Sequence, residues 1–142
     1  MALDAANVPG PAAVTIASEA DLIRVRQVLR AEANCAGFGL VDQTKLVTAG
    51  SELARNILNY ATGGRGQVLV EQLLGGGRPG VRATFSDDGP GIGNVEAALT
   101  DSFSTGGGLG LGLPGCRRLM DELRISSAPG SGTTVVIVKW TR

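Results

Sequence analysis

Residues 104–122 read STGGGLGLGLPGCRRLMDE, and this stretch decides how the rest of the chain is interpreted. Six glycines fall within positions 106–115, and Pro114 then opens a pattern typical of a helix. Glycine lets a backbone approach a ligand closely, and the start of a helix offers free N–H groups to an anion. The stretch is therefore predicted to fold over phosphate groups, although a flexible linker before a structural helix would have a similar composition.

The composition predicts one folded domain, because 43% of the 142 residues are hydrophobic and only 18% are charged. We expect residues 13–142 to form this domain and residues 1–12, with two prolines, to be a flexible lead-in. Thirteen basic residues balance thirteen acidic ones, so net charge favours neither nucleic acid nor an anionic membrane. The sequence shows neither a membrane-length apolar run nor a signal peptide, and we expect a cytoplasmic protein.

The chain contains no histidine. Its absence excludes Ser-His-Asp and Cys-His catalysis, most zinc sites and a phosphohistidine on this chain. The two cysteines, Cys35 and Cys116, are too few for a disulfide framework and are expected to be reduced. Any chemistry must therefore use carboxylates, amides, hydroxyls and the backbone.

Hydrophobic periodicity and turn residues predict the element order β-α-α-β-β-α-α-β-β. Strands are expected at 13–17, 67–74, 81–86, 124–127 and 133–140, and helices at 19–36, 42–61, 94–100 and from the glycine-rich stretch to about 123. Asp42 is expected to cap the second helix, and residues 75–80 to form a long hairpin loop. Adjacent hairpin strands and paired helices favour an α+β two-layer sandwich.

The helix expected at 42–61 carries two polar side chains beside its apolar face. Glu52 and Asn56 lie one turn apart, so their side chains project to the same place. In a wet cleft the carboxylate could orient a hydroxyl or a water, and the amide oxygen could bind Mg²⁺. A solvated polar face is the alternative. The helix is expected to bury its other face, which includes Leu46, Leu53, Ile57 and Tyr60.

A second polar segment follows the strand expected at 81–86. It reads Asp87-Asp88-Gly89-Pro90-Gly91. An acidic residue at a strand end could accept a hydrogen bond from a ligand amino group, but an Asx turn explains the same residues. Lys and Arg are absent from 83–116, and there is no GK[ST] motif, so the chain is not a P-loop protein.

Three segments occur in a fixed order: SELARNILNYA at 51–61, DDGPGI at 87–92 and GGGLGLGLPG at 106–115, with SGTTV following at 131–135. This order resembles the N-box, G1-box and G2-box of the GHKL ATPases. The phrase GLPGCRRLMDE and the terminal Lys-Trp pair are similar to the RsbT-type anti-sigma-factor antagonist kinases. The resemblance covers about residues 14–142.

The resemblance implies a Bergerat fold, in which a mixed, mostly antiparallel sheet carries helices on one face and binds ATP with Mg²⁺. It implies that Glu52 orients or deprotonates an acceptor hydroxyl, that Asn56 binds Mg²⁺, and that Asp87 accepts from the adenine amino group. The remaining nucleotide-binding residues that it implies are Gly89 and Gly91 under the base, Thr133 on the adenine side, and Gly106, Gly107, Gly108, Leu109, Gly110 and Gly112 around the phosphates.

The family also implies partners. Its members phosphorylate a serine of a STAS-domain antagonist and, once released, activate a PP2C-type phosphatase, which makes them partner-switching regulators of bacterial stress or sigma-factor pathways. One alternative is a direct anti-sigma factor of the RsbW or SpoIIAB type, which sequesters a sigma factor. Another is a nucleotide-binding module without transfer activity, against which the presence of both Glu52 and Asn56 argues.

Overall fold

The computed structural model describes residues 11–89, 112–127, 130 and 132–142. Most of the lead-in, the helix expected at 94–100, and residues 106–111 of the glycine-rich run lie outside these ranges. The described elements are β1 (Ala12–Ile16), α1 (Glu19–Ala36), α2 (Leu40–Tyr60), the 3₁₀ turn η2 (Thr62–Gly64), β2 (Gly66–Gly75), β3 (Arg78–Asp87), α4 (Gly112–Leu119), β4 (Glu122–Ser127) and β5 (Thr133–Trp140). No helix among the described residues has the length and apolar character needed to cross a membrane.

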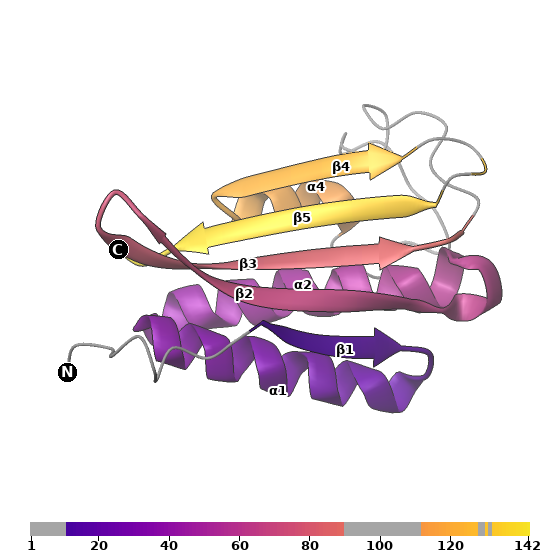
Figure 1. The fold of residues 1–142 in the computed structure, drawn as a ribbon, viewed down its shortest axis with the longest axis horizontal. Coiled ribbons are helices and arrows are strands. Elements are labelled where there is room, and N and C mark those ends of the chain that lie inside the picture. The colour runs from indigo at the N-terminus through magenta and orange to yellow at the C-terminus, as the bar shows by residue number, and fades with distance from the viewer. Residues whose placement is uncertain (1–10, 90–111, 128–129, 131) are drawn as a thin grey trace.

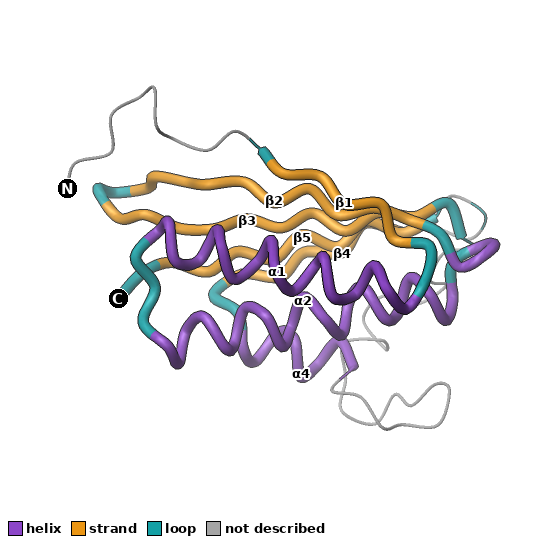
Figure 2. The backbone as a smooth tube through the Cα atoms, turned by 90° about the horizontal axis from the view of Figure 1, so that it is seen from below, coloured by secondary structure: helices purple, strands orange, loops and turns teal. Residues whose placement is uncertain are grey.

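The five strands form one sheet in the order β1-β2-β3-β5-β4 (Figure 1). All four pairings between these strands are antiparallel. The helices α1, α2 and α4 lie together on one face of the sheet, and the opposite face carries no described helix (Figure 2). The prediction of an α+β two-layer sandwich with helices on one face is therefore confirmed.

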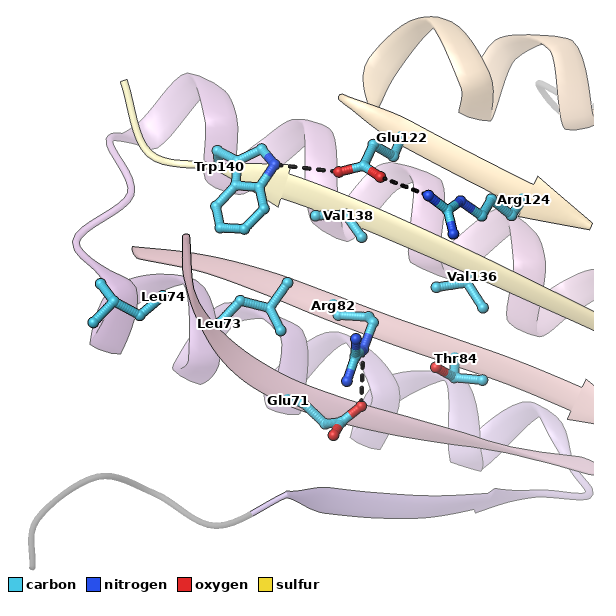
Figure 3. Close-up of a pocket in the computed structure, with 10 residues that line it drawn as sticks. All are labelled: Glu71, Leu73, Leu74, Arg82, Thr84, Glu122, Arg124, Val136, Val138 and Trp140. Carbon is cyan, nitrogen blue, oxygen red and sulfur yellow. Dashed lines mark hydrogen bonds and ion pairs between the residues drawn. The ribbon is translucent and has the colours of Figure 1, made fainter. Parts of the chain in front are cut away.

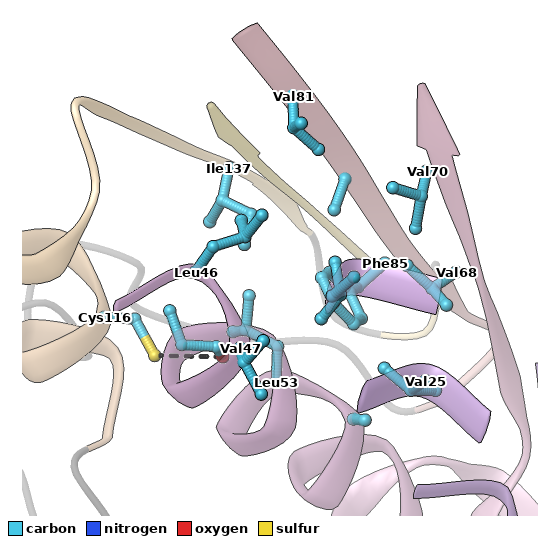
Figure 4. Packing of buried hydrophobic residues seen from close by; sticks show 14 of the residues in the cluster. Val25, Leu46, Val47, Leu53, Val68, Val70, Val81, Phe85, Cys116 and Ile137 are labelled. Carbon is cyan, nitrogen blue, oxygen red and sulfur yellow. Dashed lines mark hydrogen bonds between the residues drawn. The ribbon is translucent and has the colours of Figure 1, made fainter. Parts of the chain in front are cut away.

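The core lies between the sheet and the helices (Figure 4). Side chains alternate between the two faces of a strand, so every second residue of β2 and β3 points to the helices. These inward residues are Val68, Val70, Val81, Ala83 and Phe85. From α2 the core receives Leu46, Val47, Ala49, Leu53, Ala54 and Ile57. Cys35 and Cys116 are free thiols, as expected, and Cys116 is buried.

Two expectations for α2 are wrong. Asp42 does not cap the helix, because α2 begins at Leu40 with Gly39 as its N-cap residue. Asp42 instead lies in the first turn, and its Oδ1 is 3.6 Å from Nζ of the buried Lys139. Tyr60 was expected in the core, but it ends the helix and is 44% exposed.

The hairpin between β2 and β3 is tighter than expected. The strands continue to Gly75 and from Arg78, so the loop predicted at 75–80 shrinks to Gly76 and Gly77. These two residues have φ of 59° and 80°, the positive values that a two-residue type I′ turn requires. Gly75 and Gly80, on either side of the turn, leave room for the Trp140 ring. A Cβ on Gly75 would lie 2.7 Å from this ring, and a Cβ on Gly80 would lie 2.5 Å from it.

The helix after the glycine-rich stretch is also shorter than expected. It ends at Leu119, and β4 begins at Glu122 because Glu122 already pairs with Val138 of β5. Between them, Asp121 accepts hydrogen bonds from the Trp140 backbone N–H and the Arg142 guanidinium, each at 2.8 Å. These bonds fix the junction between α4 and β4.

Asp121 should make stability depend on pH. Burial alone would raise its pKa, but the Trp140 hydrogen bond and the charges of Lys139 and Arg142 outweigh burial and lower the pKa below 3.8. The unfolded chain then binds more protons, so this stabilisation is present above about pH 4 and is lost as the pH falls further. We expect Asp121→Asn to lower the free energy of unfolding by about 0.5–1 kcal/mol at pH 7, because Asp121 is exposed and solvent screens its interactions. Its effect should be much smaller at pH 2.5, and urea unfolding at both pH values measures this. An equal loss at both would contradict the assignment.

Candidate functional site

Three polar side chains form a row at one end of the sheet. In the strand register, Asp87 lies opposite Thr133, and Thr133 lies opposite Ser127. Residues directly opposite each other share a face of the sheet. The inward-facing Phe85 and Val135 stand two positions from Asp87 and Thr133, so this row, called the polar row below, faces the helices.

Asp87 shapes the turn that follows β3. Its Oδ1 accepts a hydrogen bond from the Gly89 N–H at 2.7 Å, which is the Asx turn weighed above as an alternative. This turn uses one carboxylate oxygen only. Within the described part of the chain no donor contacts Oδ2, so the turn and a ligand contact are compatible.

Glycines keep the backbone close to Asp87. Gly132 has a φ of 75°, and a Cβ there would collide with the Asp87 carbonyl oxygen. On the other side of Asp87, a Cβ on Gly66 would lie 2.5 Å from the Ser86 carbonyl oxygen and 2.8 Å from Ile57. The end of the polar row is therefore built on two positions that only glycine fits, and neither is among the site residues predicted from the sequence.

The second side of the candidate site comes from α2. Glu52 and Asn56 are both half-buried at the edge of the core. The Glu52 Oε1 accepts a hydrogen bond from the backbone N–H of Gly112 at 3.2 Å. Gly112 opens α4 with a φ of 66° and ends the glycine-rich run. The structure thus joins the predicted base to the predicted phosphate-binding stretch.

Cys116 contributes packing and no reactivity to this region. Its thiol lies 3.6 Å from the Ala49 carbonyl oxygen of α2. Burial, together with the charge of Glu52, raises the pKa of Cys116 to about 12. A thiol with such a pKa stays protonated at neutral pH and is a poor nucleophile.

Several predicted site residues cannot be placed. Gly91 and the phosphate-loop residues Gly106, Gly107, Gly108, Leu109 and Gly110 lie outside the described residues. Within the described ranges, no three His, Cys, Asp or Glu side chains gather as a metal site would require. Asn56 is positioned one helical turn after Glu52, as the sequence predicts.

A hollow of about 570 Å³ lies on the other face of the sheet (Figure 3). Leu73, Val138 and Trp140 line it, and it includes none of the predicted site residues. Its charged groups are already paired, with Arg82 3.1 Å from Glu71 and Arg124 3.6 Å from Glu122. The chemistry-bearing groups are on the helix face, so that face holds the candidate site.

Comparison with known proteins identifies relatives of this chain. Residues 41–141 match the family model described as histidine kinase-, DNA gyrase B- and HSP90-like ATPase. The chain is 47% identical to the serine/threonine-protein kinase RsbT of Bacillus subtilis, over 91% of this chain and 96% of that protein. It is 33% identical to the anti-sigma F factor of Bacillus licheniformis, over 68% of each chain.

Solved structures share the fold. The structure of the RsbU and RsbW domains of a Mycobacterium tuberculosis protein is similar with a TM-score of 0.65 and 25% identity, and the match covers 94% of this chain and 33% of that longer one. The mycobacterial sensor histidine kinase MprB is similar in fold, with a TM-score of 0.56 and 22% identity.

Proposed function

Since this chain belongs to the family of histidine kinase-, DNA gyrase B- and HSP90-like ATPases, and within it to the RsbT-type serine/threonine-protein kinases, we propose that it transfers the γ-phosphate of ATP to a serine of a STAS-domain antagonist. The observation that carries the proposal is the hydrogen bond from the Gly112 N–H to Glu52. It brings a carboxylate suited to general-base catalysis to the end of the glycine-rich run.

The polar row suits the base of the nucleotide. Oδ2 of Asp87 is available to accept a hydrogen bond from the adenine amino group, while Oδ1 holds the Asx turn. Thr133, directly across from Asp87, adds a hydroxyl on the same face. Gly66 and Gly132 carry no side chains that would intrude on this end of the sheet. Gly89 and Gly91 would complete the turn under the base.

Asn56 suits a magnesium ion. Its amide oxygen is a hard ligand on a half-buried helix face, and Mg²⁺ is usually bound through one or two protein oxygens together with phosphates and water. Bound there, Mg²⁺ would neutralise charge on the phosphates. Backbone N–H groups of residues 106–110 would hold the same phosphates, because no Lys or Arg lies between 83 and 116.

The transfer needs few protein groups, since phosphoryl transfer depends on positioning and charge stabilisation. Glu52 accepts the proton of the acceptor serine, whose Oγ then forms a bond to the γ-phosphorus. The bond between the γ-phosphorus and the β–γ bridging oxygen breaks, and ADP leaves. The Gly112 N–H holds Oε1 of Glu52, so the second carboxylate oxygen is the one that takes the proton.

We further propose that the protein works in the cytoplasm as a partner-switching regulator, held by the STAS antagonist and released by phosphorylation to activate a PP2C-type phosphatase. The second candidate function is direct sequestration of a sigma factor. The 33% identity to an anti-sigma F factor favours it, whereas the 47% identity to a serine/threonine kinase over nearly the full length favours the first.

Incubation with γ-labelled ATP, Mg²⁺ and purified STAS-domain proteins tests the proposal. We expect label on a serine of one STAS protein, and much slower labelling when EDTA removes the metal. Lack of transfer to every STAS protein supplied would contradict the kinase proposal. Co-purification with a sigma factor in place of a STAS protein would favour the second candidate.

A further inference from the structure

We infer that Ser127 makes the site select a 6-amino purine over a 6-oxo purine. It does so by accepting the hydroxyl proton of Thr133, so that Thr133 offers only lone pairs to a ligand. This inference rests on the proposed function, because it assumes that the polar row faces the base of the nucleotide. Ser127 is the last residue of the edge strand β4 and belongs to none of the motifs found in the sequence. Its place in the row follows only from its pairing with Thr133.

Two hydrogen bonds that Ser127 makes with other described residues determine where the protons lie. Its Oγ is 3.0 Å from the carbonyl oxygen of Gly132 and 2.9 Å from Oγ1 of Thr133. A carbonyl oxygen can only accept, so Ser127 must donate its single hydroxyl proton to Gly132. Thr133 must then be the donor in the hydrogen bond between the two hydroxyl groups.

The Gly132 carbonyl is held in the position that this arrangement needs. Gly132 is buried and has a φ of 75°, and its Cα lies so close to the Asp87 carbonyl that a Cβ would collide with it. The peptide therefore has little freedom to turn its oxygen away from Ser127. A buried carbonyl without a hydrogen-bond donor is unfavourable. The Ser127 hydroxyl therefore continues to donate its proton to the Gly132 carbonyl.

Thr133 consequently offers only lone pairs to a ligand. Asp87, directly across from it on the same face, offers carboxylate oxygen as well. Two neighbouring acceptors match the two N–H donors of a 6-amino group. A 6-oxo purine would set its carbonyl oxygen against both, and sites that leave polar groups mispaired discriminate strongly between analogues.

Binding of ATP and inosine triphosphate, each with Mg²⁺, by the wild type and by Ser127→Ala tests this inference. Inosine triphosphate carries the 6-oxo group without the 2-amino group of guanine, so it isolates the position in question. In Ser127→Ala the Thr133 proton is free to point at a ligand. We expect the preference for ATP over inosine triphosphate to fall about tenfold, the factor that 1.4 kcal/mol represents.

Matched variants separate this effect from a structural one. Ser126→Ala removes the neighbouring, exposed hydroxyl and should leave both affinities unchanged. Ser127→Thr keeps the donor and should keep the preference. Ser127→Cys, whose thiol is a weaker donor, should lower the preference for ATP in the same way as Ser127→Ala. It takes the place of Ser127→Ala if the alanine variant fails to fold.

The outcomes distinguish the inference from its premise. An equal loss of affinity for both nucleotides in Ser127→Ala and in Ser127→Cys, with unchanged preference, would overturn the inference and leave the ATP site standing. A wild type that binds neither nucleotide would overturn the proposed function and the inference with it. Ser127→Ala is also combined with Thr133→Val. If this second change abolishes the reduction in preference that Ser127→Ala causes, the result supports the route through Thr133.

Discussion

Glu52→Gln is expected to slow phosphate transfer by about 10²–10⁴-fold, the range that general-base catalysis contributes. A glutamine side chain cannot take the serine proton. Its amide oxygen can still accept the Gly112 N–H, so the contact between α2 and α4 should persist. Nucleotide affinity should stay within about threefold of the wild type, because less than 1 kcal/mol of binding free energy is affected. Single-turnover transfer and calorimetric binding of ATP with Mg²⁺ measure the two quantities separately.

Glu71→Gln is the matched control for this experiment. Glu71 is also a partly buried glutamate, but it pairs with Arg82 on the open face of the sheet. Its replacement should leave the transfer rate within about twofold, since partly exposed ion pairs contribute little. Transfer by Glu52→Gln at the wild-type rate would show that Glu52 is not the base.

Asp87→Asn is expected to weaken ATP binding by about 10–100-fold, which corresponds to one hydrogen bond to a charged group. The asparagine oxygen can keep the Asx turn by accepting from the Gly89 N–H, so the fold around the turn should survive. Its amide nitrogen would then meet the adenine amino group, placing donor against donor. Calorimetry with ATP and Mg²⁺ measures the loss, and thermal unfolding verifies that the variant is folded.

Asp88→Asn provides the comparison, because Asp88 is the adjacent acidic residue and is exposed. It should bind ATP like the wild type. If Asp87→Asn also binds ATP normally, the assignment of Asp87 to the adenine amino group is wrong.

Local patterns predicted much of this molecule. The apolar spacing in residues 42–61 correctly placed Leu46, Leu53 and Ile57 in the core and Glu52 and Asn56 at its edge. Such spacing works because a helix brings residues three and four apart onto one face, whatever the rest of the chain does. The strand predicted at 81–86 was also found, as the central part of β3.

Features that depend on contacts between distant segments could not be predicted from the sequence. The glycines at 75 and 80 suggested a long loop, but they make room for Trp140, which is some 60 residues later in the chain. Ser127 reaches the polar row only because β4 pairs with β5 at the edge of the sheet. Tyr60 fits the apolar face of a helical wheel, yet α2 ends there and leaves its ring 44% exposed.

A crystal structure with Mg²⁺ and a non-hydrolysable ATP analogue would test most directly whether Glu52, Asn56 and Asp87 surround one nucleotide. We expect the adenine amino group within hydrogen-bond distance of Asp87 and the metal ion bound by the amide oxygen of Asn56. A nucleotide bound on the open face of the sheet, in the hollow beside Trp140, would contradict this site.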